Sequence, residues 1–169
     1  REIEKTYLHE DYQSATPRFT RDLSTPGEPV VNDAFINIEW LGCPDGVTGD
    51  TCASGSPRTA AGTSIETTCE NLNWAGHSDW MVPTVAMIRS LTDFSAATWQ
   101  ADVNTAFPNL GNIILGSNTR PSSESTTMMV VRYDGYSYAD NAGNVLCVRA
   151  PNGGALPGKV QHCLQTSTW

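Results

Sequence analysis

The fold is decided by the stretch Gly76-His77-Ser78-Asp79-Trp80-Met81-Val82-Pro83-Thr84, which concentrates residues with special backbone or packing behaviour. Gly76 can take the positive φ that ends a preceding helix, and Asp79 can accept hydrogen bonds from turn N–H groups. Trp80 supplies a large apolar side chain. Pro83 blocks further strand pairing, and Thr84 can N-cap a following helix. The stretch therefore predicts a buried structural corner between two helices.

Helical patterns flank this corner on both sides. The preceding helix is expected to begin at the capping box Thr63-Ser64-Ile65-Glu66. Its apolar stripe consists of Ile65, Cys69 and Leu72. The following helix is expected from residue 84 to about residue 93, with a buried face of Val85, Ile88 and Leu91. We assign Met87, beside that face, to core packing rather than to a Met-rich binding groove.

The corner resembles a known family when two more segments are added. With Cys69-Glu70-Asn71-Leu72 before it and Cys147-Val148-Arg149 far downstream, it is similar to the Lcl C-terminal domain family, found in bacterial surface and secreted proteins including collagen-like adhesins. The similarity runs from about residue 30 to residue 149. His77 and Met81 depart from the Tyr and Arg that are usual there. The resemblance implies a C-type-lectin-like α+β fold, with two helices packed on small antiparallel sheets, long irregular loops and disulfide staples.

Length and composition favour one domain with appendages. The 169 residues, 39% of them hydrophobic, suffice for one sizeable core. We expect an N-terminal extension over residues 1–28, the C-type-lectin-like domain over 29–150 and a C-terminal extension over 151–169. The net charge of −8 disfavours nucleic acid, anionic polysaccharide and anionic lipid as partners. No run approaches a membrane span, and the start at Arg1 without a charged-then-apolar leader suggests a processed product.

The two extensions allow more than one interpretation. Residues 1–28 are either a flexible linker or carry a short helix over residues 2–8 that must pack on something. The extensions either join neighbouring copies in a repeating assembly or fold back on their own domain. Residues 1–28 and 151–169 thus offer a way to build an assembly.

The chain has five cysteines, and none forms a C-x-x-C pair, which disfavours a metal site. We expect disulfides instead, which indicate an oxidising, extracellular or cell-surface location. Cys43 and Cys52 bracket a loop poor in apolar residues, which favours a disulfide over two free buried thiols. The family resemblance implies a second bond between Cys69 and Cys147. Cys163 is then left unpaired or available for an intermolecular bond.

Strand patterns fill most of the remaining domain. A strand is expected at residues 30–31, a turn at Asn32-Asp33, and a second strand over residues 35–41. Residues 113–115 form a short strand, followed by a long loop over residues 116–125 that can carry specificity. A meander is expected next, with strands at residues 127–133, 136–138 and 145–150. Its turns are Asp134-Gly135 and residues 141–144.

Catalytic and metal sites find little support. His9, His77 and His162 are the only histidines, and hydrolase, phosphate-loop and dinucleotide motifs are absent. We interpret His77 as a hydrogen-bonded structural residue rather than a general base. We expect the domain to bind no cofactor; the alternative is a bound calcium ion. Its candidate oxygen clusters are Asp45 with Asp50, and Asp140 with Asn141 and Asn144, although turns favour these residue types anyway.

The sequence thus predicts a non-catalytic, adhesin-like binding module for a glycan or a protein. The candidate ligand-binding residues are Trp99, Asn118, Arg120, Tyr136 and Tyr138. Tyr136 and Tyr138 share a strand face, so they form either an aromatic platform or a solvated sheet surface. One alternative is a structural subunit of a fibre or pilus-like assembly. A remote alternative is a formylglycine-generating-type enzyme, which needs two reactive cysteines in one cleft.

Overall fold

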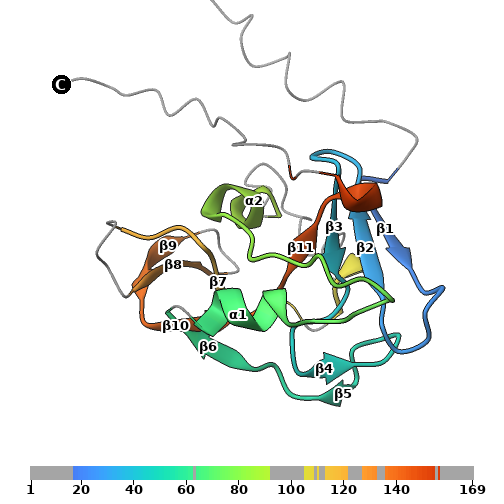
Figure 1. Cartoon of the computed structure of the whole chain (residues 1–169), viewed down its shortest axis with the longest axis horizontal. Coiled ribbons are helices and arrows are strands. Elements are labelled where there is room, and N and C mark those ends of the chain that lie inside the picture. Colours follow the sequence, from blue (N-terminus) through green and yellow to red (C-terminus); the bar gives the residue numbers. More distant parts are fainter. Residues whose placement is uncertain are drawn as a thin grey trace, which may run out of the picture.

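The computed structural model describes residues 17–62, 64–91, 105–108, 110, 113–121, 127–132, 136–154 and 156. Within this part the chain is a mixed α+β protein with two α-helices and three small sheets (Figure 1). Two disulfides connect distant or irregular segments. The α+β class expected from the sequence is therefore present.

One sheet contains four antiparallel strands in the order β1-β2-β3-β11. Their bounds are Phe19–Asp22, Val30–Asp33, Ile38–Leu41 and Val148–Arg149. Trp40 of β3 lies opposite Val31 on one side and Val148 on the other, and all three are buried. This row of apolar pairs forms one wall of the core.

The turn that was predicted at Asn32-Asp33 lies further along the chain. Both residues belong to β2, and residues 34–37 make the turn, with Asn37 at a φ of 53°. The Asp33 carboxylate accepts a hydrogen bond from Phe35 N (3.0 Å), so Asp33 opens the turn while still pairing with Ile38. The predicted turn was therefore placed two residues too early.

Part of the predicted N-terminal extension belongs to the sheet. Strand β1 pairs with β2 along its whole length. Arg18, just before β1, binds the Asp33 carboxylate through Nε (3.0 Å) and Nη2 (2.8 Å), and its Nη1 donates to Ser90 O (2.5 Å). The buried Asp33 is thereby neutralised. Residues 17–28 are thus an edge of the fold, whereas residues 1–16 lie outside the described part.

A second sheet contains five strands in the order β6-β10-β7-β8-β9. Their bounds are Thr59–Ala61, Ala142–Asn144, Leu115–Gly116, Met128–Val131 and Ser137–Asp140. The β8-β9 pair is the first hairpin of the predicted meander, and its turn residues lie outside the described part. The remainder of the meander was wrong. The expected turn at residues 141–144 contains β10, and the next strand, β11, pairs with β3 in the other sheet.

Strands β7 and β10 run parallel and approach closely at two glycines. A Cβ added to Gly143 would lie 2.7 Å from the Gly116 Cα, and one added to Gly116 would lie 2.6 Å from the Ile65 Cδ1. Real side-chain carbons do not approach so closely. Glycine at both positions therefore lets the two strands and the first helix pack in layers.

The helices are short and pack on the second sheet. Helix α1 (Ser64–Glu70) lies against β6, and helix α2 (Val85–Ser90) lies against β8. Thr84 caps α2 as predicted, because its hydroxyl accepts a hydrogen bond from Met87 N (3.2 Å). A two-stranded sheet, β4 (Val47–Thr48) with β5 (Ser54–Gly55), and a 3-10 turn, η1 (Pro151–Gly153), complete the described elements.

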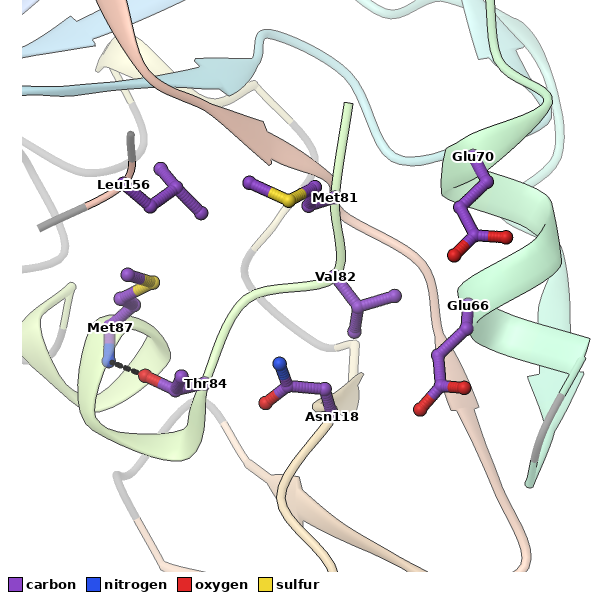
Figure 2. A pocket seen from close by; sticks show the side chains of 8 residues that line it. All are labelled: Glu66, Glu70, Met81, Val82, Thr84, Met87, Asn118 and Leu156. Carbon is purple, nitrogen blue, oxygen red and sulfur yellow. Dashed lines mark hydrogen bonds between the residues drawn. The ribbon is translucent and has the colours of Figure 1, made fainter. Parts of the chain in front are cut away.

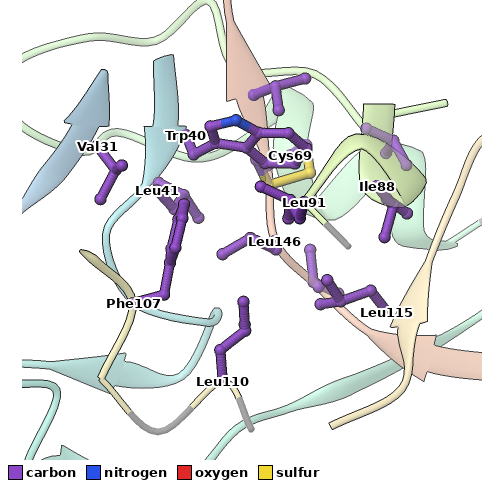
Figure 3. Packing of buried hydrophobic residues seen from close by; sticks show 14 of the residues in the cluster. Val31, Trp40, Leu41, Cys69, Ile88, Leu91, Phe107, Leu110, Leu115 and Leu146 are labelled. Carbon is purple, nitrogen blue, oxygen red and sulfur yellow. A yellow bond between two sulfur atoms is a disulfide. The ribbon is translucent and has the colours of Figure 1, made fainter. Parts of the chain in front are cut away.

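The core lies between the sheets and helices (Figure 3). The ring of Phe107 packs edge-on against Trp40, with centroids 6.4 Å apart, and against Phe19, at 5.6 Å. The Cys69–Cys147 disulfide passes through the centre of this core. The Cys43–Cys52 disulfide closes the loop that contains β4, so both expected pairs are present.

The predicted corner has a different backbone from the one expected. Helix α1 ends at Glu70, so Gly76 does not stop it. Instead, Ala75 (φ 52°) and Gly76 (φ 76°) form a tight two-residue turn, in which Trp74 and His77 exchange both backbone hydrogen bonds at 3.0 Å. The His77 side chain is exposed.

Trp80 is the anchor of this corner. Only 1% of its surface is exposed, as the sequence predicted. Its Nε1 donates to His77 O (3.1 Å) and Trp74 O (3.3 Å), so the indole also satisfies carbonyls of the tight turn. Beyond it, pairing ends after Met81, and the buried Pro83 begins the approach to α2.

The two disulfides should differ in how much they stabilise the fold. Their sequence separations are 78 residues for Cys69–Cys147 and 9 residues for Cys43–Cys52. Loop-closure entropy predicts losses of about 4.5 and about 2.5 kcal/mol when each pair is replaced by alanines. Chemical denaturation of the two double variants measures this difference, and equal or reversed losses would contradict the central role of the longer bond.

Replacing Trp80 by Ala should lower the free energy of unfolding by about 3–5 kcal/mol, because a fully buried aromatic ring is removed. The control is Tyr136→Ala. This residue is 63% exposed, and its loss should cost less than about 1 kcal/mol. Denaturant midpoints compare the two variants, and a Trp80→Ala midpoint as high as that of the control would show that the corner is peripheral.

Candidate functional site

A pocket of about 430 Å³ lies beside the corner, between α1 and α2 (Figure 2). Its walls come from α1, the corner segment, α2, the loop after β7 and the chain after η1. The Cys69–Cys147 disulfide and the Thr84 cap fix the first three of these. The pocket is therefore assembled from segments held by the core.

One wall of the pocket is acidic. Glu66 and Glu70 are one helical turn apart on α1, so both carboxylates point from the same face toward the pocket (Figure 2). Glu66 pairs with Arg120 through Nη2 (3.2 Å). Glu70 is exposed and makes no ion pair with any described residue. One of the two negative charges is therefore left without a counter-charge in this part of the chain.

The opposite wall is apolar. It is formed by Met81, which is 42% exposed, and by Met87 and Leu156 (Figure 2). Val82 lies between this wall and α1. Thioether side chains are flexible and polarizable, so they adapt to the aliphatic part of a ligand.

The loop that was predicted to carry specificity reaches the pocket. Asn118 lines it, and its backbone N–H donates to Pro83 O (3.0 Å). Thr119 Oγ1 accepts from Val85 N (3.2 Å), which adds a second contact with the start of α2. Ser117 Oγ donates to Met129 O (2.7 Å). These bonds hold the Asn118 side chain, which is exposed, at the pocket rim.

Arg120 does not line the pocket but pairs with Glu66, which does. Besides the bond to Glu66, its Nη1 is buried and has no hydrogen-bond partner within the described residues. Only 19% of its side-chain surface is exposed. Arg120 therefore contacts the pocket only through Glu66, and its removal would leave that carboxylate without its partner.

The predicted ligand-binding residues divide into separate groups. Asn118 lines the pocket, and Arg120 is connected to it only through its ion pair with Glu66. Tyr136 and Tyr138 stack at the β9 edge, with ring centroids 6.0 Å apart, and do not line the pocket. Trp99 lies outside the described residues. The four candidate residues that the structure describes therefore do not form a single binding patch.

Sequence reasoning missed most of the pocket. Glu66 appeared only as part of a capping box, and Glu70 only as part of the Cys69-Glu70-Asn71-Leu72 segment of the family resemblance. Like charges at this spacing destabilise an isolated helix by roughly 0.2–0.5 kcal/mol. The Glu66–Glu70 spacing could therefore have indicated that these two carboxylates have a role that offsets this cost. Met87, assigned to the core, is indeed 4% exposed but also lines the pocket. Leu156 belongs to the predicted C-terminal extension.

An ion network around the buried Arg149 lies next to the corner. Arg149 of β11 donates from Nε to Asp79 (2.8 Å) and from Nη1 to Glu39, and it lies 5.9 Å from the Trp80 ring. Burial alone would lower the pKa of Arg149, but its hydrogen bonds to Asp79 and Glu39 outweigh this and raise the pKa. Asp79 was predicted to cap the turn. It forms this ion pair instead, because β11 brings Arg149 within reach.

The candidate calcium oxygens have structural partners. Asp45 pairs with Arg58 (2.8 Å), and Asp50 accepts from Gly27 N (2.9 Å). Asn144 accepts from Ile114 N (3.3 Å). Within the described ranges, no group of three or more His, Cys, Asp or Glu side chains gathers as metal ligands do. Asp45, Asp50 and Asn144 therefore each have a structural role in the fold.

Comparisons of this chain with protein-family models, curated proteins and solved structures found no match. The resemblance to the Lcl C-terminal domain family therefore stays a prediction from the sequence.

Among the described helices, none is long and apolar enough to cross a membrane. The two disulfides are typical of an oxidising compartment. Cys163 lies outside the described residues.

The Asp79–Arg149 pair should make stability depend on pH. The hydrogen bond from Arg149 holds the pKa of Asp79 below its ordinary value. A lowered folded-state pKa means that the carboxylate stabilises the fold above its unfolded pKa of about 3.9, and this contribution is lost as the pH falls through the folded value. The free energy of unfolding should therefore differ between wild type and Asp79→Asn at pH 5–7, and the difference should shrink below about pH 4.

Urea denaturation across this pH range measures the effect. Asp22→Asn serves as the control, because it removes an exposed carboxylate that makes no ion pair with a described residue. A difference for Asp79→Asn that stays constant down to pH 2 would contradict the assigned pair.

Proposed function

We propose that this chain is a non-catalytic, C-type-lectin-like binding module that acts outside the cytoplasm, on a bacterial surface or in a secreted protein. Its ligand, a protein or a glycan, binds in the pocket between α1 and α2. The pocket itself carries this proposal. It is formed by segments that the core holds in place, and it presents an exposed Asn118, an exposed carboxylate of Glu70 and an apolar wall. Pockets of this size with few polar groups are typical ligand sites.

The bonded cysteines support the non-catalytic interpretation. All four cysteines in the described ranges form disulfides, so they offer no free thiol for nucleophilic chemistry of the formylglycine-generating type. Among the described residues, no carboxylate or nucleophile forms a hydrogen bond with the exposed His77 side chain, and the neighbouring Asp79 pairs with Arg149. The polar groups at the pocket suit recognition.

The disulfides also support a location outside the cytoplasm. The Cys43–Cys52 bond stabilises a loop with little apolar content, and Arg21 adds hydrogen bonds to Gly42 O (2.7 Å) and Asp50 O (2.8 Å) there. Loops of this kind need a permanent covalent closure, which oxidising compartments provide. A surface or secreted module fits this requirement.

Binding is tested with the purified chain on arrays of bacterial and host glycans and of extracellular-matrix proteins, read by biolayer interferometry. We expect saturable binding to one of these ligands. Asn118→Trp should weaken it at least about tenfold, because the indole fills the pocket mouth while the backbone contacts of residue 118 are kept.

Tyr136→Ala is the matched comparison, since Tyr136 is exposed but lies on the separate β9 surface. We expect it to bind like wild type. Weakened binding by Tyr136→Ala together with normal binding by Asn118→Trp would move the ligand site to the tyrosine pair. No saturable binding to any array member would contradict the proposed function.

A further inference from the structure

The charge of the pocket restricts what can bind there. Glu66 and Glu70 face it from α1, and Arg120 neutralises Glu66 alone. No cationic side chain is among the described residues that line the pocket. A ligand group that enters beside Glu70 therefore meets an uncompensated negative charge, and a cation is favoured over an anion or a neutral group.

The apolar wall adds a second requirement. Met81, Met87 and Leu156 lie across the pocket from the two carboxylates (Figure 2). An inorganic cation would gain nothing from this surface. An organic cation on an aliphatic stem would contact the thioethers with its methylenes and the carboxylates with its charged end. Both walls of the pocket then contribute to binding.

We infer that the pocket receives a basic side chain, lysine or arginine, from a protein partner. The inference rests on the proposed function and names the ligand class for the same site. Both side chains join a methylene stem to a cationic head, as the two walls require. The net charge of −8 draws a basic partner toward this surface. A glycan has less to gain, because no aromatic ring lies among the described lining residues to stack on a sugar.

The methionines provide a direct readout. The chain has four, of which Met81 and Met87 line the pocket, whereas Met128 is fully buried in the core. The full chain with 13C-methyl methionine is titrated with acetyl-lysine methylamide and acetyl-arginine methylamide. The comparison ligands are acetyl-norleucine methylamide, which has the stem without the charge, and a neutral methyl glycoside.

Both basic probes should shift the Met81 and Met87 methyl signals and leave Met128 unchanged. Their half-saturation concentration should be about threefold lower than that of the norleucine probe, the size expected for a partly exposed ion pair. Glu70→Gln should remove this advantage. Asp140→Asn, which removes a partly buried carboxylate on β9 that does not line the pocket, should preserve it, and added salt should reduce it.

Equal binding of the norleucine and lysine probes would overturn the inference and leave an apolar pocket with the proposed function intact. Shifts by the glycoside alone would also overturn it, in favour of a glycan ligand.

The chain's own Lys159 follows Leu156 closely in sequence. If Lys159→Gln moves the Met81 and Met87 signals without any probe, this lysine rather than a partner occupies the pocket. No shift by any probe or variant would count against the inference and the proposed pocket together.

Discussion

The Cys69–Cys147 disulfide holds the chain at the point where it passes from one sheet to the other. Cys147 lies between β10 of the five-stranded sheet and β11 of the four-stranded sheet, and Cys69 belongs to α1. A covalent bond over 78 residues thus fixes the helix, both sheets and the core between them. Because α1 carries Glu66 and Glu70, the same bond sets the position of the acidic pocket wall.

Arginines connect the segments that regular secondary structure does not hold. Arg18 joins β2 to the end of α2, Arg21 joins β1 to the disulfide loop and to Ala106, and Arg149 joins β11 to the corner. Burial lowers the pKa of Arg21, whose donors are directed at backbone carbonyls and sulfur atoms. Removing one partner of such a group leaves a charge or a carbonyl without compensation, so these contacts specify one arrangement of irregular chain.

The pocket gains its rigidity from these same connections. Thr84 and Thr119 both accept hydrogen bonds from the start of α2, and Met81 pairs with Val148 through two backbone bonds. A site held in this way loses little conformational freedom on binding, which leaves more of the contact energy for affinity. The flexible thioethers of Met81 and Met87 supply the adaptable part. The combination is consistent with the proposed binding of a partner's basic side chain.

The sequence by itself determined the α+β class, the start and cap of α2, the β8-β9 hairpin, the burial of Trp80 and the loop disulfide. These features depend on neighbours within a few residues or on the size of one side chain. Only the tertiary structure decided that Gly76 belongs to a tight turn, that Asp79 meets Arg149 and that Glu70 faces Met81 across a pocket. The last two depend on segments that are brought together when β10 and β11 separate into different sheets. Local periodicity carries no information about that separation, because it reports which face of an element is buried and not which distant element covers it.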